Sequence, residues 1–156
     1  MTKDDFWSFD LAPIWSLIEN AGIQREQQKR GFQSTRAWRG DASTHVPSIA
    51  GEVAAAIRLG QPMDAVLRVN GDDGYDLPDG TDVKTVVGHW PPILKHPVNA
   101  KRWPPMFALV YLDAKVAHYI GRVRAETLAN GPIKNFGYGD NYTWTHPAME
   151  PAYAHL

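Results

Sequence analysis

The positions of apolar residues predict helices in the first half of the chain. Residues 14–21 carry an apolar stripe at helical spacing. We expect this helix to stop before Gly22, and a polar turn or second helix to follow over residues 24–30. Residues 48–59 carry a longer stripe, which predicts a helix closed by a glycine. Residues 32–46, rich in Ser, Thr, Gly and Arg, are typical of a loop.

Beyond residue 62 the pattern changes to short apolar runs typical of strands. Strands are predicted at residues 66–69, 74–77, 81–87, 106–112 and 116–120. This order indicates a mostly antiparallel meander. The expected fold class is α/β or α+β, with a central mixed, largely antiparallel β-sheet flanked by helices.

Two further segments interrupt or follow these strands. The proline-rich residues 88–105 predict a long exposed loop, because proline cannot donate to a strand ladder. Residues 122–129 predict a short helix, and the residues from 131 onward an irregular tail.

Length and composition bound the class of protein. The 156 residues suit a single domain over 1–156, with an N-terminal helical region (1–47), a core (48–130) and a C-terminal tail (131–156). The chain has no apolar run of the roughly 18 residues that a membrane span needs. It also has no cysteine, which excludes disulfide and zinc–thiolate scaffolds. The first ten residues lack the pattern of a secretory signal, so a cytoplasmic, intracellular location is expected.

A turn signal with unusual charges stands at residues 74–85, GYDLPDGTDVKT. Pro-Asp-Gly fits a three-residue hairpin loop with glycine in the left-handed conformation. If the residues flanking this loop pair, Asp76 lies across from Asp82 and Lys84 shares the face of Asp82. Two carboxylates and an ammonium group are therefore expected to converge.

Like charges placed opposite each other destabilise a sheet, and a divalent cation would remove that conflict. Carboxylate oxygens are the ligands that Mg²⁺ prefers. In the simpler alternative, Lys84 neutralises both aspartates on a strand that faces solvent.

Glu52 lies on the apolar stripe of the second predicted helix. A buried carboxylate is expected to be paired, hydrogen-bonded or bound to metal, because burying it alone is costly. The alternative is a glutamate at the helix edge that caps the first turn after Ser48.

These residues follow a recognisable order: Glu52 on a helix, Asp76 on one predicted strand, and Asp82-x-Lys84 on the next. This order resembles that of the PD-(D/E)XK nuclease superfamily, which has the restriction-endonuclease-like fold. The resemblance covers about residues 48–120. The residue before Asp76 is a tyrosine, where the family name has proline.

This resemblance implies a metal-dependent nuclease that hydrolyses the phosphodiester bonds of DNA. Asp76 and Asp82 would hold Mg²⁺ or Mn²⁺, with the Val83 carbonyl as a further ligand. Glu52 would complete the site, and Lys84 would position the attacking water. The alternative is a catalytically silent protein of this fold that binds nucleic acid or a protein partner.

Basic residues are unevenly distributed along the chain. No Asp or Glu occurs from Val83 to Leu112. Expected DNA contacts in two basic clusters are Arg36, Arg39, Lys95, Lys101, Arg102 and Trp103. The alternative for both clusters is ordinary solvated surface. Besides DNA, the partners left open are a second copy of the chain and a targeting protein.

Overall fold

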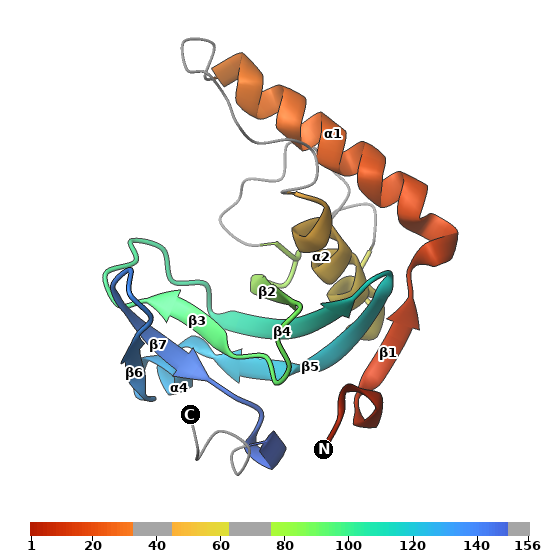
Figure 1. Cartoon of the computed structure of the whole chain (residues 1–156). Helices are drawn as coiled ribbons and strands as arrows, with labels where there is room; N and C mark the ends of the chain where they lie inside the picture. Colours follow the sequence, from red (N-terminus) through yellow and green to blue (C-terminus); the bar gives the residue numbers. More distant parts are fainter. Residues whose placement is uncertain (33–44, 63–75, 150–156) are drawn as a thin grey trace.

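The protein combines helices with two β-sheets (Figure 1). The computed structural model describes residues 1–32, 45–62 and 76–149. Its helices are α1 (Trp15–Phe32), α2 (Val46–Arg58) and α4 (Ala125–Ala129), with short 3₁₀ turns at Lys3–Asp5, Ala12–Ile14 and Pro147–Met149. None of the described helices is both long enough and apolar enough to cross a membrane.

The first sheet has four described strands in the order β1-β5-β4-β2. These are β1 (Trp7–Asp10), β2 (Thr81–Val87), β4 (Met106–Asp113) and β5 (Val116–Arg124). The β1–β5 and β4–β5 pairs are antiparallel, whereas β2 and β4 are parallel. The predicted mixed sheet is confirmed. The simple meander is wrong, because the long connection after β2 returns the chain to the end of the sheet where β2 began.

A second, three-stranded antiparallel sheet has the order β3-β7-β6. Its strands are β3 (Leu94–Pro97), β6 (Ile133–Asn135) and β7 (Asp140–Trp144). Two predictions were wrong here. Residues 88–105 were predicted to be a loop but contain β3, and the tail from residue 131 was predicted to be irregular but contains β6 and β7. Among the described strands β3 pairs only with β7, and Pro97 stands at its last position, where proline is tolerated.

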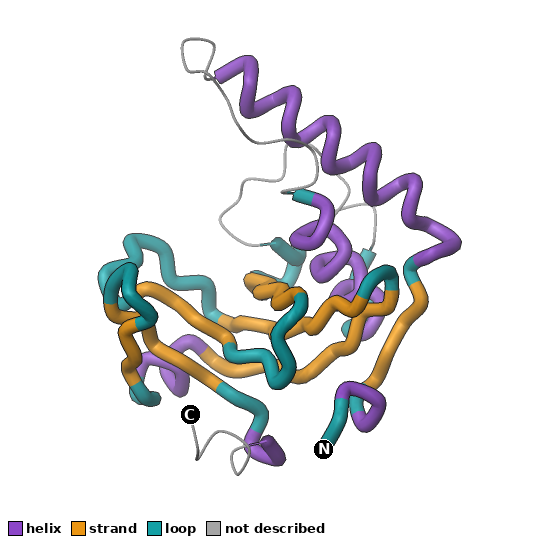
Figure 2. The backbone as a smooth tube through the Cα atoms, viewed as in Figure 1, coloured by secondary structure: helices purple, strands orange, loops and turns teal. Residues whose placement is uncertain are grey.

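Strand β4 is apolar along almost its whole length because both of its faces are covered. Ala108 and Val110 pack with α2 in one buried cluster. Phe107 and Leu109 pack on the other side in a second cluster, which includes Leu94 of β3. Figure 2 shows the resulting layers, with α1 and α2 over one face of the first sheet and the second sheet beside the opposite face.

The helices differ from the sequence-based prediction mainly at Gly22. Helix α1 runs through this residue without a break. Glycine inside a helix costs about 1 kcal/mol relative to alanine, and the packing of Ile18 and Ala21 in the core offsets that cost. The prediction for α2 is confirmed to within two residues, and Gly60 follows it with a left-handed φ of 67°. The predicted strand at 66–69 and most of the predicted loop at 32–46 fall outside the described residues, as does the first half of the predicted strand at 74–77.

Helix α2 approaches the sheet most closely at Gly51. A Cβ placed on Gly51 would lie 1.8 Å from Oγ1 of Thr85 on β2. We therefore expect Gly51→Ala to lower the free energy of unfolding by about 1–3 kcal/mol. Adding Thr85→Ala removes the colliding oxygen, so the double variant is expected to lose less than the sum of the two single changes. Urea unfolding of the three variants measures this coupling.

Ser48→Ala, at an exposed position of the same helix, is the control and should change stability by less than about 0.5 kcal/mol. Strictly additive effects of Gly51→Ala and Thr85→Ala would contradict the close contact.

Candidate functional site

A tight turn places Asp76 beside the beginning of β2. The Gly80 amide donates to the Leu77 carbonyl at 3.0 Å, and the Thr81 amide donates to Asp79 Oδ1 at 2.9 Å. Gly80 adopts a φ of 91°. These contacts confirm the predicted Pro-Asp-Gly turn. Asp76 and Leu77 themselves are not in a strand, so the predicted strand at 74–77 is wrong for these two residues.

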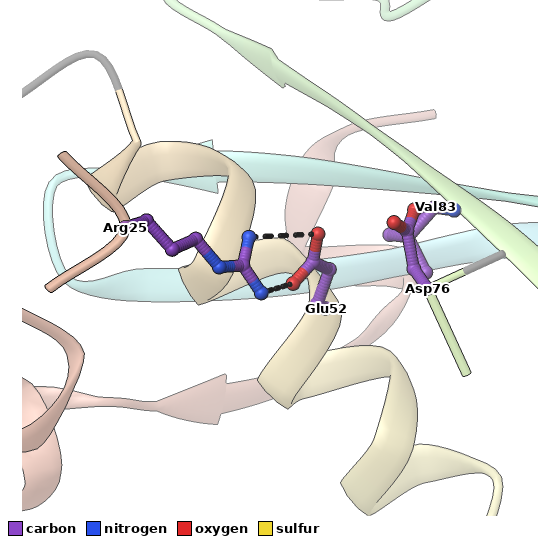
Figure 3. A network of polar contacts seen from close by, with 4 residues as sticks. All are labelled: Arg25, Glu52, Asp76 and Val83. Atoms are coloured by element: carbon purple, nitrogen blue, oxygen red, sulfur yellow. Dashed lines mark hydrogen bonds and ion pairs between the residues drawn. The ribbon is translucent and has the colours of Figure 1, made fainter. Parts of the chain in front are cut away.

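The Asp76 side chain is fixed by the backbone of β2. Its Oδ2 accepts a hydrogen bond of 2.7 Å from the Val83 amide. Val83 lies between Asp82 and Lys84, so this bond holds the Asp76 carboxylate against the middle of the Asp-x-Lys segment. Figure 3 shows Asp76 with Val83 on one side and Glu52 on the other.

Glu52 reaches this site from α2. Its side chain is buried and forms a two-point contact with Arg25 of α1, at 2.8 Å between Nη2 and Oε2 and 3.4 Å between Nη1 and Oε1 (Figure 3). Burial raises the pKa of Glu52, against the opposing effect of the Arg25 guanidinium. The expectation that this carboxylate is buried and paired is confirmed. Its role as a metal ligand stays a prediction.

Asp82 and Lys84 form an ion pair on the same strand, with Lys84 Nζ 2.9 Å from Asp82 Oδ2. This oxygen is buried and has no aligned hydrogen-bond donor in the described part of the chain. Side chains on alternate residues of a strand share a face, and this geometry confirms the predicted proximity of the aspartate and the lysine.

Asp76 has the most perturbed ionisation in this group. Burial, followed by the charges of Glu52 and Asp82, raises the pKa of the Asp76 carboxyl to about 8, although the Val83 amide opposes the shift. Two neighbouring carboxylates can raise each other's pKa only when they are close. The same interactions indicate that Glu52 and Asp82 lie near Asp76; the sequence predicted this for Asp82, and the resemblance implied it for Glu52.

These residues offer oxygen donors suited to a hard divalent cation. Asp82 carries a buried oxygen without an aligned donor, and burial and the neighbouring carboxylates raise the pKa of Asp76. Glu52 is already engaged by Arg25. Over the described ranges, no set of three His, Cys, Asp or Glu side chains is arranged closely enough to hold a metal ion. Asp76 and Asp82 therefore fit a metal better than Glu52 does.

The residues expected to contact DNA lie beside the second sheet where they are described. Lys101 and Arg102 are exposed, and Lys95 projects from β3. The Trp103 ring is 38% exposed and packs edge-on against His96, with a distance of 4.5 Å between centroids. Trp103 is therefore partly a packing residue. Arg36 and Arg39 lie outside the described residues.

Sequence reasoning missed Arg25 and His96. Arg25 is not among the predicted site residues, because its partner Glu52 is remote in sequence. His96 is buried and its Nε2 lies 3.1 Å from the Arg102 carbonyl. Burial and then the Lys84 charge lower the pKa of His96, so its neutral form donates this hydrogen bond and fastens the connection after β3.

Two hollows differ in their relation to Lys84, and none of Glu52, Asp76 and Asp82 lines either of them. A cavity of about 310 Å³ is lined by Lys84 together with His89 and Lys95. A second hollow, of about 900 Å³, lies along α4, β6 and β7 and is not lined by Lys84. The smaller cavity is therefore the one connected to the candidate site.

Comparisons of this chain with protein-family models, with curated proteins and with solved structures found no match. The functional assignment consequently depends on the residues and their geometry.

The raised pKa of Asp76 predicts how stability changes with pH. Between the ordinary value of 3.8 and the folded value of about 8, the folded state holds a proton that the unfolded state releases. Stability should therefore fall as pH rises through this window, by up to about 1.4 kcal/mol per pH unit. Asp76→Asn should remove most of this slope. Urea unfolding across the window, in a chelator, measures the difference between the two proteins.

Parallel stability curves for the wild type and Asp76→Asn would contradict the shift. Asp113→Asn is the control. It changes a partly exposed aspartate at the last position of β4, and stability should fall with pH as steeply as in the wild type.

Proposed function

We propose that this protein is a metal-dependent deoxyribonuclease with the PD-(D/E)XK arrangement of residues. Asp76 and Asp82 are the proposed metal ligands, Lys84 is the proposed water-positioning residue, and Glu52 supports the site from α2. Mg²⁺ or Mn²⁺ is the proposed cofactor.

The observation that carries this proposal is the convergence of Asp76, Asp82 and Lys84 beside one backbone amide. Asp76 accepts from Val83, and Asp82 and Lys84 flank Val83 and pair with each other. Neighbouring carboxylates that are largely withdrawn from water, with the pKa of Glu52 and of Asp76 raised, are costly to keep for stability alone. A site for a cation and a phosphate accounts for that cost.

Each side chain has a distinct role in the proposed reaction. A bound divalent cation supplies a Lewis acid and lowers the pKa of a coordinated water. Asp76 and Asp82 would provide the negative oxygens that hold it, once Asp76 has lost its proton. Lys84 would orient the attacking water and neutralise charge that develops on the phosphate. The Arg25 contact opposes the effect of burial on the pKa of Glu52 and holds its carboxylate in place beside Asp76.

Cleavage of DNA in the presence of Mg²⁺ or Mn²⁺ tests the proposal. The wild type should cut plasmid or oligonucleotide DNA, and a chelator should abolish cutting. Asp82→Ala removes a proposed ligand and should lower the cleavage rate by at least about 100-fold. Gel analysis of the products over time measures both rates.

Asp113→Asn is a matched control because it removes one carboxylate charge outside the site, and it should cut like the wild type. Thermal unfolding verifies that each variant is folded. Cutting by Asp82→Ala at the wild-type rate would overturn the assignment.

A second candidate is a protein of the same class that binds nucleic acid or a protein partner without cutting. The ion pairs Arg25–Glu52 and Lys84–Asp82 favour it, because each already satisfies one of the carboxylates. A cation must compete with these pairs, which a silent protein would simply retain.

Calorimetric titration with Mn²⁺ in the presence of DNA separates the two candidates. A nuclease should bind the metal, and Asp76→Ala should weaken that binding by at least about tenfold. Asp113→Asn should leave it unchanged. No detectable metal affinity in the wild type would favour the silent protein.

A further inference from the structure

We propose that the tip of the β6–β7 hairpin is a stacking platform for an unpaired nucleotide, and that the substrate therefore contains single-stranded DNA. The platform comprises Phe136, Tyr138 and Lys95. This inference rests on the proposed function for the identity of the nucleic acid, and it adds a binding site that the catalytic residues do not include.

The two aromatic rings of the platform are exposed and stacked. Phe136 and Tyr138 are 36% and 70% exposed. Their ring centroids lie 6.2 Å apart with an interplanar angle of 22°. Exposed large aromatic side chains leave apolar surface in contact with water, and a ligand or partner that covers them removes that surface from water. A flat, nearly parallel pair suits a flat aromatic ligand such as a nucleobase.

Lys95 joins the platform to the candidate active site. Its Nζ lies 3.8 Å from the centroid of the Phe136 ring and 3.3 Å from the Tyr138 hydroxyl. Lys95 also lines the cavity of about 310 Å³ that Lys84 lines. A strand that enters this cavity beside Lys84 would thus meet an ammonium group and then two aromatic rings.

The charge of the surrounding surface matches a phosphate backbone. Lys101 and Arg102 are exposed on the connection after β3, and Lys134 is exposed on β6. The connection and β3 contain no acidic residue, and the hairpin contains one, Asp140. Basic side chains that border aromatic rings are the usual composition of surfaces that bind single strands.

The rings favour a single strand over a duplex for a geometric reason. Paired bases stack on each other and show only their edges in the grooves, so a protruding ring has no base face to cover. An unpaired nucleotide can turn its face to Tyr138, the more exposed ring, while Lys95 contacts the adjacent phosphate.

Binding measured without metal tests the platform separately from catalysis. Fluorescence anisotropy in a chelator would compare a labelled single-stranded oligonucleotide of about 15 nucleotides with a duplex of equal length. Tyr138→Ala and Phe136→Ala should each weaken single-strand binding roughly tenfold and change duplex binding less than twofold. Tyr138→Phe keeps the ring and should bind like the wild type.

Ile133→Ala is the matched control. Ile133 lies on the same hairpin, is 53% exposed, and is outside the aromatic pair, so its removal should leave both affinities unchanged. Unchanged single-strand binding by Tyr138→Ala would overturn the platform and favour a protein partner for this surface. An equal loss on duplex DNA would overturn the preference for unpaired bases.

Cleavage of duplex and single-stranded DNA with Mn²⁺, measured in parallel, distinguishes the two proposals. Binding that depends on Tyr138 but is never followed by cutting retains the platform and overturns the nuclease. Cutting without any effect of Tyr138→Ala on single-strand binding retains the nuclease and overturns the platform.

Discussion

Repulsion among three neighbouring carboxylates is the constraint on which the candidate site depends; Glu52 is buried, and Asp76 and Asp82 are partly buried. Glu52, Asp76 and Asp82 come from α2, a turn and β2, and burial strengthens the interactions among them. The protein limits this repulsion with the Arg25 guanidinium and the Lys84 ammonium group, and the raised pKa of Asp76 favours its uncharged form.

The packing of α2 on the sheet sets the geometry of this group. Gly51 lies so close to Thr85 that a side chain would not fit between helix and strand. Glu52 is the next residue, so the distance between α2 and β2 determines how near the Glu52 carboxylate comes to Asp76. The contact between α1 and α2 then brings Arg25 within reach of Glu52. The charge balance of the site therefore depends on how α1 and α2 pack.

The residues of the site were more predictable than the fold around them. Asp76, Asp82 and Lys84 are linked by a short turn, and local spacing is enough to bring them together. Glu52 was recognisable because a carboxylate on an apolar stripe is unusual. Arg25 was not, because an ion pair between two helices leaves no local pattern. Strand β3 was missed for a similar reason, since its proline-rich sequence becomes a strand only by pairing with β7.

The pairing of β1 with β5 affects the order in which the protein can fold. Trp7 lies opposite Tyr119, and the Leu11 amide bonds the Lys115 carbonyl directly before α1 begins. The helix that carries Arg25 is thus anchored by strands made much later in synthesis. Contacts so distant in sequence form slowly. A ribosome-bound chain would hold Glu52, Asp76 and Asp82 before β5 could anchor α1 and the counter-charge that it carries.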